Sequence, residues 1–248
     1  MILQKRVYTL LIVVLACLQY NTLVAQLSNK DSLLYKTAIE NTQQVYYKNI
    51  GDQATKYNGS QYQGYTVSFS DGQPYYKIDA LRQGTILYNG VLFKDVQLLY
   101  DEIADCVILQ DSAHRIKLVN EKLKSFSILE DRFERLEKDN DNNPIIGTGF
   151  YQVLTTGKAA LYKKETKKMI DKFTNSTELS VLFEIHEYYY IKKSGRFFEI
   201  KNKKSLYSIL GEKAKELMQY TKKEKLNYRK EKDLMLTSVV DYYNKLSQ

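Results

Sequence analysis

The stretch TILYNGVLF constrains this chain more than any other, because it predicts a tight β-hairpin. Asn89 and Gly90 stand between two runs rich in β-branched, aromatic and other apolar residues. Both central residues of a type I′ turn need a positive φ, and Asn-Gly is the pair that tolerates this best. We therefore expect strands at 84–88 and 91–100 that pair antiparallel.

The period of two continues beyond this hairpin. Two more hairpins are expected, with turns at Thr156-Gly157 and Ser194-Gly195. A βαβ pattern does not occur. These features predict an α+β fold: an antiparallel β-rich meander, built as a sandwich or a partly closed barrel. Short apolar runs between turn-forming residues predict its other strands at 106–110, 115–119, 124–129 and 132–136.

Helical patterns flank the predicted sheet. Residues 32–47 place apolar residues near one stripe, which predicts an N-terminal helix. Near the other end, Ser205 can cap a helix that stops at Gly211. Apolar residues at helical spacing continue to Leu246. We therefore expect two to three C-terminal helices packed on the sheet.

The first 25 residues have the three parts of a secretory signal. Lys5 and Arg6 precede an apolar run at 7–18, and the small residue Ala25 stands where a peptidase would cut. The apolar run is shorter than the roughly 20 residues that a membrane-spanning helix needs. The sequence therefore predicts three segments: a signal peptide at 1–25, an antiparallel β-rich domain with an N-terminal helix at 26–200, and a basic helical segment at 201–248.

Cys17 offers an alternative to simple cleavage. Ala16-Cys17 resembles the site at which bacterial lipoproteins are acylated, but Leu15 is bulky and the residues after Cys17 stay apolar. We expect cleavage before Gln26 and a periplasmic or outer-membrane-associated protein; a lipoprotein anchored through Cys17 is the alternative. Cleavage would leave Cys106 as the one cysteine, so the mature chain would have no internal disulfide.

The formal net charge of +8 is unevenly distributed along the chain. Residues 26–157 carry −3 and residues 158–248 carry +9. A basic region of this kind either faces an anionic partner, such as a glycan or lipid head groups, or is a solvated helical face. The candidate anionic-partner surface consists of Lys192, Lys193, Arg196, Lys201, Lys203, Lys204, Lys213, Lys215, Lys222 and Lys223.

Tyrosine is abundant, with 22 residues against no tryptophan. In the stretch 186–207 aromatic rings alternate with lysine and arginine, a mixture that stacks on sugar faces while it neutralises anions. The same alternation is expected where rings fill a core and lysines face water. Nucleic acid is not an expected partner of an exported chain.

Few residues offer catalytic or metal-binding chemistry. A Cys-His nucleophile would need Cys106 to meet His114 or His186 in space, and a buried strand cysteine is the commoner case. The acidic stretch 139–144 has oxygen ligands at alternate positions, as a calcium loop does, but Pro144 stands where that loop needs glycine. We predict no catalytic residue, no cofactor and no metal site, and the sequence favours a protein that is not an enzyme.

Four distinctive stretches occur in one chain: YNGVLFKDVQLLYDEIADCVIL, IKLVNEKLKSFSI, GFYQVLTTGKAALYKK and YYYIKKSGRFFEIKNKKSLYSILGEKAKELMQYTKKEKLNYRK. Together they resemble a family of uncharacterised exported proteins of Bacteroidota. The resemblance covers about 58–246. It implies an envelope location and no assigned catalysis, cofactor or ligand.

The function expected from the sequence is general. We expect a non-enzymatic binding or assembly module of the cell envelope, whose partner is an envelope protein or an anionic glycan or lipid surface. The mature chain is expected to have no transmembrane span. The alternative is a hydrolase that acts on envelope glycan or peptide.

Overall fold

The computed structural model describes residues 34, 37–39, 41–42, 45, 59–67, 69, 71–111, 114–138, 145–173 and 179–247. The chain divides into two compact units, Met1–Ala54 and Thr55–Gln248. Described residues of the first unit are helical, as predicted for 32–47. The predicted signal peptide with Cys17 and the acidic stretch 139–144 lie outside the described residues. None of the helices that the structure describes is long and apolar enough to span a membrane.

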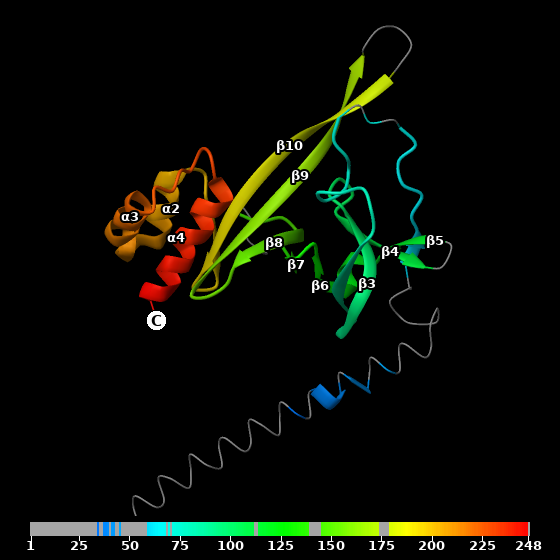
Figure 1. Cartoon of the computed structure of the whole chain (residues 1–248), viewed down its shortest axis with the longest axis horizontal. Helices are drawn as coiled ribbons and strands as arrows, with labels where there is room; N and C mark the ends of the chain where they lie inside the picture. Colours follow the sequence, from blue (N-terminus) through cyan, green and yellow to red (C-terminus); the bar gives the residue numbers. More distant parts are fainter. Residues whose placement is uncertain are drawn as a thin grey trace, which may run out of the picture. The chain divides into compact units, whose positions relative to one another are not determined.

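The second unit is built on one antiparallel sheet, with the strand order β1-β5-β4-β3-β2-β6-β7-β8-β9-β10-β11 (Figure 1). The expected antiparallel β-rich α+β fold is therefore confirmed, and the sheet is open rather than closed. The strands are β1 (Gly59–Gln61), β2 (Arg82–Tyr88), β3 (Val91–Asp101), β4 (Cys106–Asp111), β5 (His114–Leu118), β6 (Leu123–Ile128), β7 (Asp131–Leu136), β8 (Gly149–Thr155), β9 (Ala159–Phe173), β10 (Leu179–Lys193) and β11 (Arg196–Glu199).

The hairpin at Asn89-Gly90 forms as predicted. Asn89 has φ 51° and Gly90 has φ 77°, so both central residues take the positive φ that the tight turn requires. The turn at Ser194-Gly195 repeats this geometry, with φ 50° and 79°. The predicted strands at 106–110, 115–119, 124–129 and 132–136 match β4 to β7 within a few residues, and β8–β9 and β10–β11 form the other two predicted hairpins.

The open sheet is curled, so that the turn after β3 lies close to β9. β3 and β9 are five places apart in the sheet order, which in a flat sheet would separate them by about 24 Å. Yet the turn that follows β3 forms two ion pairs of 2.7 Å with β9, Lys164 with Asp105 and Lys167 with Glu102. Side chains therefore join the curled sheet at a place where no described strands pair.

An aromatic cluster fills the inside of the curl. Phe126 and Phe133 stack with centroids 4.7 Å apart, and Tyr76 meets Phe133 edge to face at 4.9 Å. Tyr100 and Phe150 complete the contacts, Tyr100 at 5.0 Å from Phe126 and Phe150 at 5.3 Å from it. Aromatic pairs at such distances add to the stability already gained by burial.

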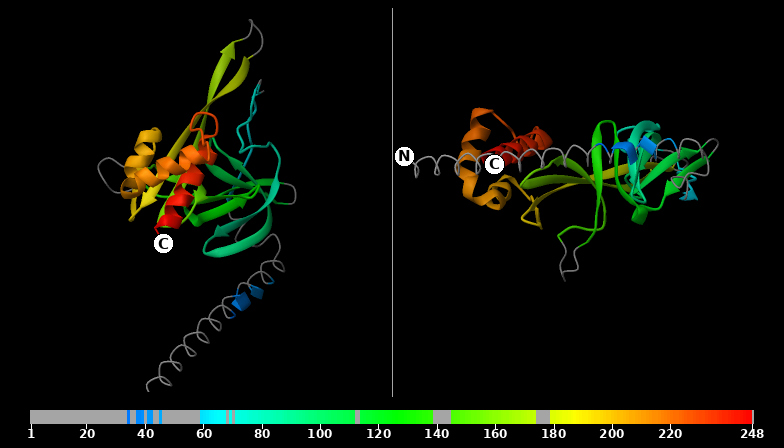
Figure 2. Two further views of the ribbon diagram at one scale, coloured as in Figure 1. Left: turned by 60° about the vertical axis from the view of Figure 1, so that its left-hand side comes forward. Right: turned by 90° about the horizontal axis from the view of Figure 1, so that it is seen from below.

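Three C-terminal helices cover one end of the long β9–β10 ribbon (Figures 1 and 2). They are α2 (Lys203–Leu210), α3 (Ala214–Lys223) and α4 (Lys232–Leu246). A buried cluster joins Leu161 and Tyr189 of the ribbon to Leu206, Leu217 and Val239 of the helices. Tyr190 points to the opposite face, where it packs with other rings. The consecutive tyrosines Tyr189 and Tyr190 therefore enter two different cores, one on each face of the ribbon.

The start of α2 differs in detail from the prediction. Ser205 was expected to cap this helix, but the cap is Asn202, whose side chain accepts from the main-chain N–H of Ser205 at 3.0 Å. Ser205 lies at the third helical position and its hydroxyl accepts from the Asn202 N–H, also at 3.0 Å. The two form a reciprocal capping box. The predicted stop at Gly211 is correct, with φ 55°.

Asp101 anchors the segment before β2 to the end of β3. Its carboxylate is fully buried and accepts hydrogen bonds from the hydroxyls of Tyr62 and Tyr65, each at 2.8 Å. It also accepts from the main-chain N–H groups of Ile103 and Ala104, both at 2.9 Å. The burial of this charge is therefore offset by hydrogen bonds, two of which shape the β3–β4 turn.

We expect the substitution Asp101→Ala to lower the free energy of unfolding by about 3 kcal/mol, because several buried donors lose their acceptor. Urea unfolding followed by circular dichroism measures the change. Asp79→Ala is the matched control, since Asp79 is exposed; it should change stability by less than about 0.5 kcal/mol. Equal midpoints for the two variants would contradict the anchoring role.

The Glu102–Lys167 pair predicts a pH dependence of stability. Burial raises the pKa of Glu102 to about 7, although the hydrogen bond from Lys167 acts to lower it. A raised pKa in the folded state stabilises the fold below the ordinary pKa of about 4.5, and this stabilisation is lost as the pH rises to about 7.

We therefore expect wild type to lose about 3 kcal/mol of stability relative to Glu102→Gln between pH 4 and pH 8. Urea unfolding of both proteins across this range gives the difference. The glutamine variant serves as the reference because every other titrating group is shared. A difference that stays constant with pH would show that the pKa of Glu102 is not raised.

Candidate functional site

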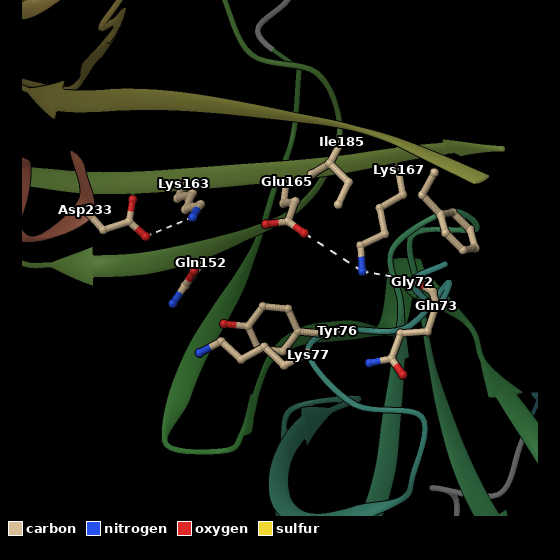
Figure 3. Close-up of a pocket in the computed structure, with 11 residues that line it drawn as sticks. Gly72, Gln73, Tyr76, Lys77, Gln152, Lys163, Glu165, Lys167, Ile185 and Asp233 are labelled. Carbon is tan, nitrogen blue, oxygen red and sulfur yellow. Dashed lines mark hydrogen bonds and ion pairs between the residues drawn. The ribbon is translucent and has the colours of Figure 1, made fainter. Parts of the chain in front are cut away.

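A cleft lies on one face of the ribbon, next to the helices (Figure 3). Its volume is about 240 Å³, below the roughly 300–1,000 Å³ of pockets for drug-sized ligands. The cleft therefore suits a small ligand. It is lined by Gly72, Gln73, Tyr76, Lys77, Gln152, Lys163, Glu165, Lys167, Phe183, Ile185 and Asp233.

Strand alternation places the floor of this cleft. Successive strand residues point to opposite faces, so Lys163, Glu165 and Lys167 of β9 share one face. Gln152 of β8 is directly opposite Lys163, and Ile185 of β10 is opposite Lys167. Charged side chains from the middle strand are therefore flanked by an amide on one side and an apolar side chain on the other.

The first turn of α4 supplies one wall of the cleft. Asp233 accepts from Lys163 at 2.8 Å, and Glu187 of β10 pairs with the same lysine at 2.6 Å. The hydroxyl of Tyr189 also donates to Asp233. Burial lowers the pKa of Lys163, but the two carboxylates outweigh it and raise the pKa above the ordinary value. Lys163 therefore stays charged.

Residues 71–77 supply the opposite wall. Lys167 reaches across to this segment and donates to the carbonyl groups of Tyr75, at 2.9 Å, and Gln73, at 3.1 Å. Its third partner is Glu102 at 2.7 Å. Lys167 thus has two main-chain acceptors and one buried ion-pair partner within the protein, and it acts as a structural tie.

Glu165 differs from Lys163 and Lys167 because its side chain has few partners within the protein. Its side chain is 24% exposed, and its ion-pair partner among the described residues is Lys167 at 3.9 Å. Figure 3 shows the carboxylate directed into the cleft between Lys163 and Lys167. A carboxylate has about four lone-pair sites, so most of the hydrogen-bonding capacity of Glu165 is open to a ligand.

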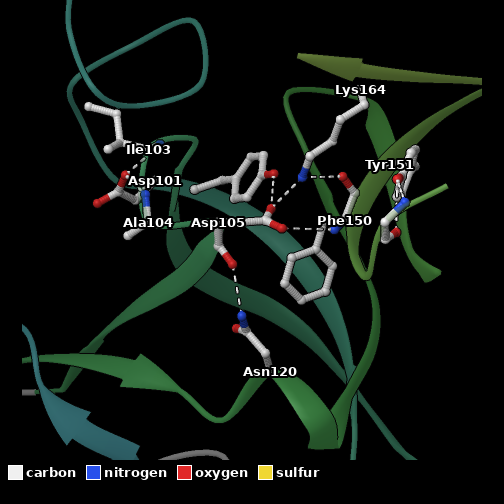
Figure 4. A network of polar contacts seen from close by, with 10 residues as sticks. Asp101, Ile103, Ala104, Asp105, Asn120, Phe150, Tyr151 and Lys164 are labelled. Carbon is white, nitrogen blue, oxygen red and sulfur yellow. Dashed lines mark hydrogen bonds and ion pairs between the residues drawn. The ribbon is translucent and has the colours of Figure 1, made fainter. Parts of the chain in front are cut away.

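A second polar network lies behind the cleft and has a structural role (Figure 4). Asp105 accepts from Lys164 at 2.7 Å, from the hydroxyl of Tyr100 at 2.6 Å and from the N–H of Phe150 at 3.3 Å. The carbonyl group of Asp105 accepts from Asn120 at 2.8 Å. The carboxylate and the carbonyl group of Asp105 are thus both used within the protein. The network joins the β3–β4 turn to β8 and β9.

The residues considered for nucleophilic catalysis do not form a site. Cys106 is fully buried in β4, and burial raises the pKa of its thiol to about 12, which disfavours the reactive thiolate. His114 is exposed on β5. His186 is half exposed and contacts Glu184 at 3.2 Å, on the ribbon face away from the cleft. Within the described ranges, no three His, Cys, Asp or Glu residues are grouped as a metal site would need.

The ten predicted basic surface residues are spread over several elements. Lys192, Lys193 and Arg196 lie at the β10–β11 turn, and the other seven lie at the start of α2 or along η4 (Gly211–Lys213) and α3. Three have acidic neighbours: Lys193 with Glu212 at 3.6 Å, Lys201 with Glu199 at 3.9 Å, and Lys213 with Glu216 at 3.8 Å. Whether they form one partner surface stays a prediction.

Sequence reasoning missed the cleft. The stretch KKETKK holds Lys163, Glu165 and Lys167 at alternate positions, and on a strand this spacing places the three on one face. That local signal was available. The residues that contact this face of β9 could not be predicted in the same way, because tertiary folding brings Asp233, Glu102 and the 71–77 segment to the strand.

No protein-family model, curated protein or solved structure matches the chain. The resemblance to exported proteins of Bacteroidota therefore stays a prediction. The case for a function rests on the chemistry of the cleft.

Proposed function

We propose that this protein is a non-enzymatic binding module of the cell envelope that takes a small polar ligand in the cleft. The observation that carries the proposal is the carboxylate of Glu165, which lies inside a walled cleft with one ion-pair contact at 3.9 Å among the described residues. At 24% exposure this carboxylate is reached by water, which a ligand with matching donors would displace. A bound ligand would complete the set of partners.

The rest of the cleft favours binding over hydrolysis. Lys163 and Lys167 are fixed by ion pairs of 2.6–2.8 Å, so their positions are set before a ligand arrives. Groups held in this way reduce the ordering cost of binding. The alternative of a hydrolase needs a nucleophile or a general acid beside a reacting bond. Of the residue types considered for it, the carboxyl groups of Glu165 and Asp233 line the cleft, and Cys106 and the two histidines do not.

The envelope location in this proposal is supported by the secretory pattern at 1–25. The basic stretch 192–204 supports an orienting role there, because its six cations and one acid give a net charge of +5. Such a stretch is attracted to an anionic glycan or lipid surface. The cleft and the basic stretch would then act together: one binds a small ligand and the other holds the module near the envelope.

A cleft-blocking variant tests the binding proposal. Ile185 is 54% exposed at the edge of the cleft, so Ile185→Trp should fill the space without disturbing the core. We expect wild type to bind members of a panel of amines, amino acids, sugars and small carboxylates, and this variant to lose the binding at least tenfold. Ligand-observed NMR followed by calorimetry measures it.

Ile170→Trp is the matched control for the cleft-blocking variant. Ile170 is 44% exposed on the same ribbon, and strand alternation places it on the other face. It should bind ligands as wild type does. Equal binding by all three proteins would place the ligand outside the cleft and refute the proposal.

The orienting role of the basic surface predicts a change in cell fractionation. Replacing Lys213, Lys215, Lys222 and Lys223 with Glu alters the charge by −8, which should move the protein from membrane-associated to unbound envelope fractions. Immunoblotting of fractions at low and high salt measures the shift. An unchanged distribution would exclude these lysines as the surface that holds the protein.

A further inference from the structure

The ligand groups that the cleft can accept follow from what its residues already bind. Lys167 has three protein partners, and Lys163 has two carboxylates within 2.8 Å. Gln152 donates to Asp131 at 2.8 Å. The principal acceptor with open capacity is therefore Glu165.

The cleft lining carries three lysines and two carboxyl groups, and carboxyl groups outside the lining pair with each of the lysines. Three lysines are matched by five carboxyl groups that lie in the cleft or in ion-pair contact with its lining: Glu102, Asp131, Glu165, Glu187 and Asp233. The charge of Glu165 helps to raise the pKa of Glu102, which is the unfavourable effect that one carboxylate has on another. An added positive charge at Glu165 would relieve it.

The aromatic residues that line the cleft also favour a cation. The rings of Tyr76 and Phe183 line the cleft, and the ammonium group of Lys77 lies 5.0 Å from the centroid of the Tyr76 ring. The face of an aromatic ring attracts a cation within about 6 Å. The cleft therefore places a carboxylate with open capacity near aromatic rings, one of which already lies against the ammonium group of Lys77.

We propose that the ligand is a small primary amine, whose ammonium group donates to the carboxylate of Glu165. This inference rests on the proposed function and adds the chemical class of the ligand. An ammonium group supplies three donors to a carboxylate that has about four lone-pair sites. A simple anion is disfavoured by Glu165, and a neutral sugar would add no counter-ion to Lys167, which lies 3.9 Å from this carboxylate.

Matched pairs of ligands isolate the ammonium group. Glucosamine and N-acetylglucosamine differ by acetylation of one amine, and putrescine and its diacetylated form differ by acetylation of two. At pH 6.5 we expect wild type to bind each free amine at least tenfold more tightly than its acetylated counterpart, as measured by calorimetry. The pair that shows binding also identifies whether an amino sugar or an aliphatic amine is preferred.

Two variants assign the ammonium contact to Glu165. Glu165→Gln keeps the size of the side chain and removes its charge, and should weaken amine binding about tenfold or more. Glu184→Gln removes one negative charge from the other face of the same ribbon, so it should bind as wild type does. Circular dichroism spectra and unfolding midpoints establish that both variants are folded.

The outcomes separate the two proposals. Equal binding of free and acetylated ligands, still lost in Ile185→Trp, overturns the amine inference and leaves cleft binding in place. Equal weakening by Glu165→Gln and Glu184→Gln also overturns it, because the effect would then be one of net charge. Failure of wild type to bind any member of the full panel overturns both.

Discussion

The architecture depends on an ion pair withdrawn from water. Lys167 and Glu102 are 65 positions apart in the sequence, and their side chains are 7% and 1% exposed. Removing two such charges from water costs several kcal/mol for each, and this cost is recovered only when geometry and additional hydrogen bonds are good. The carbonyl groups of residues 73 and 75 supply such bonds to Lys167, whereas the buried Oε2 of Glu102 relies on the ion pair with Lys167. The pair therefore requires the curl of the sheet and the position of the 71–77 segment together, and the cleft exists because both are fixed.

Strand β9 connects the parts of the unit through its two faces. Lys164 on one face reaches Asp105, while Lys167 on the other reaches Glu102, so two residues of one turn are held from both sides of a strand. Farther back along the same strand, Leu161 enters the core beneath the helices. The 15-residue length of β9 allows it to meet the curled sheet and the helical layer at different points. Between those points the floor of the cleft is left uncovered.

Local signals in the sequence predict the elements well and the cleft poorly. The turn at Asn89-Gly90 is determined by two residues whose backbone preferences are intrinsic, so strand pairing there follows without knowledge of the remaining chain. The capping residue of α2 is harder to predict from the sequence, because Asn202 and Ser205 both have suitable side chains and the capping box uses them reciprocally. The cleft was missed because alternation assigns Glu165 to a face but cannot say what covers that face. The distant partners Glu102 and Asp233 are defined by tertiary packing.

The short pairing of β11 leaves part of β10 as a sheet edge. β11 pairs with residues 190–193, and Phe69 forms a bridge at Val181. Between them, in the described part of the chain, strand pairs involve only the β9 side of residues 182–188. An open edge with exposed apolar residues, here Ile185 and Tyr188, is a template for aggregation during folding. Glu184 and Glu187 alternate with them, so a second copy that approached in register would bring like charges together. Such repulsion would oppose pairing of the ribbon with a second copy at this edge.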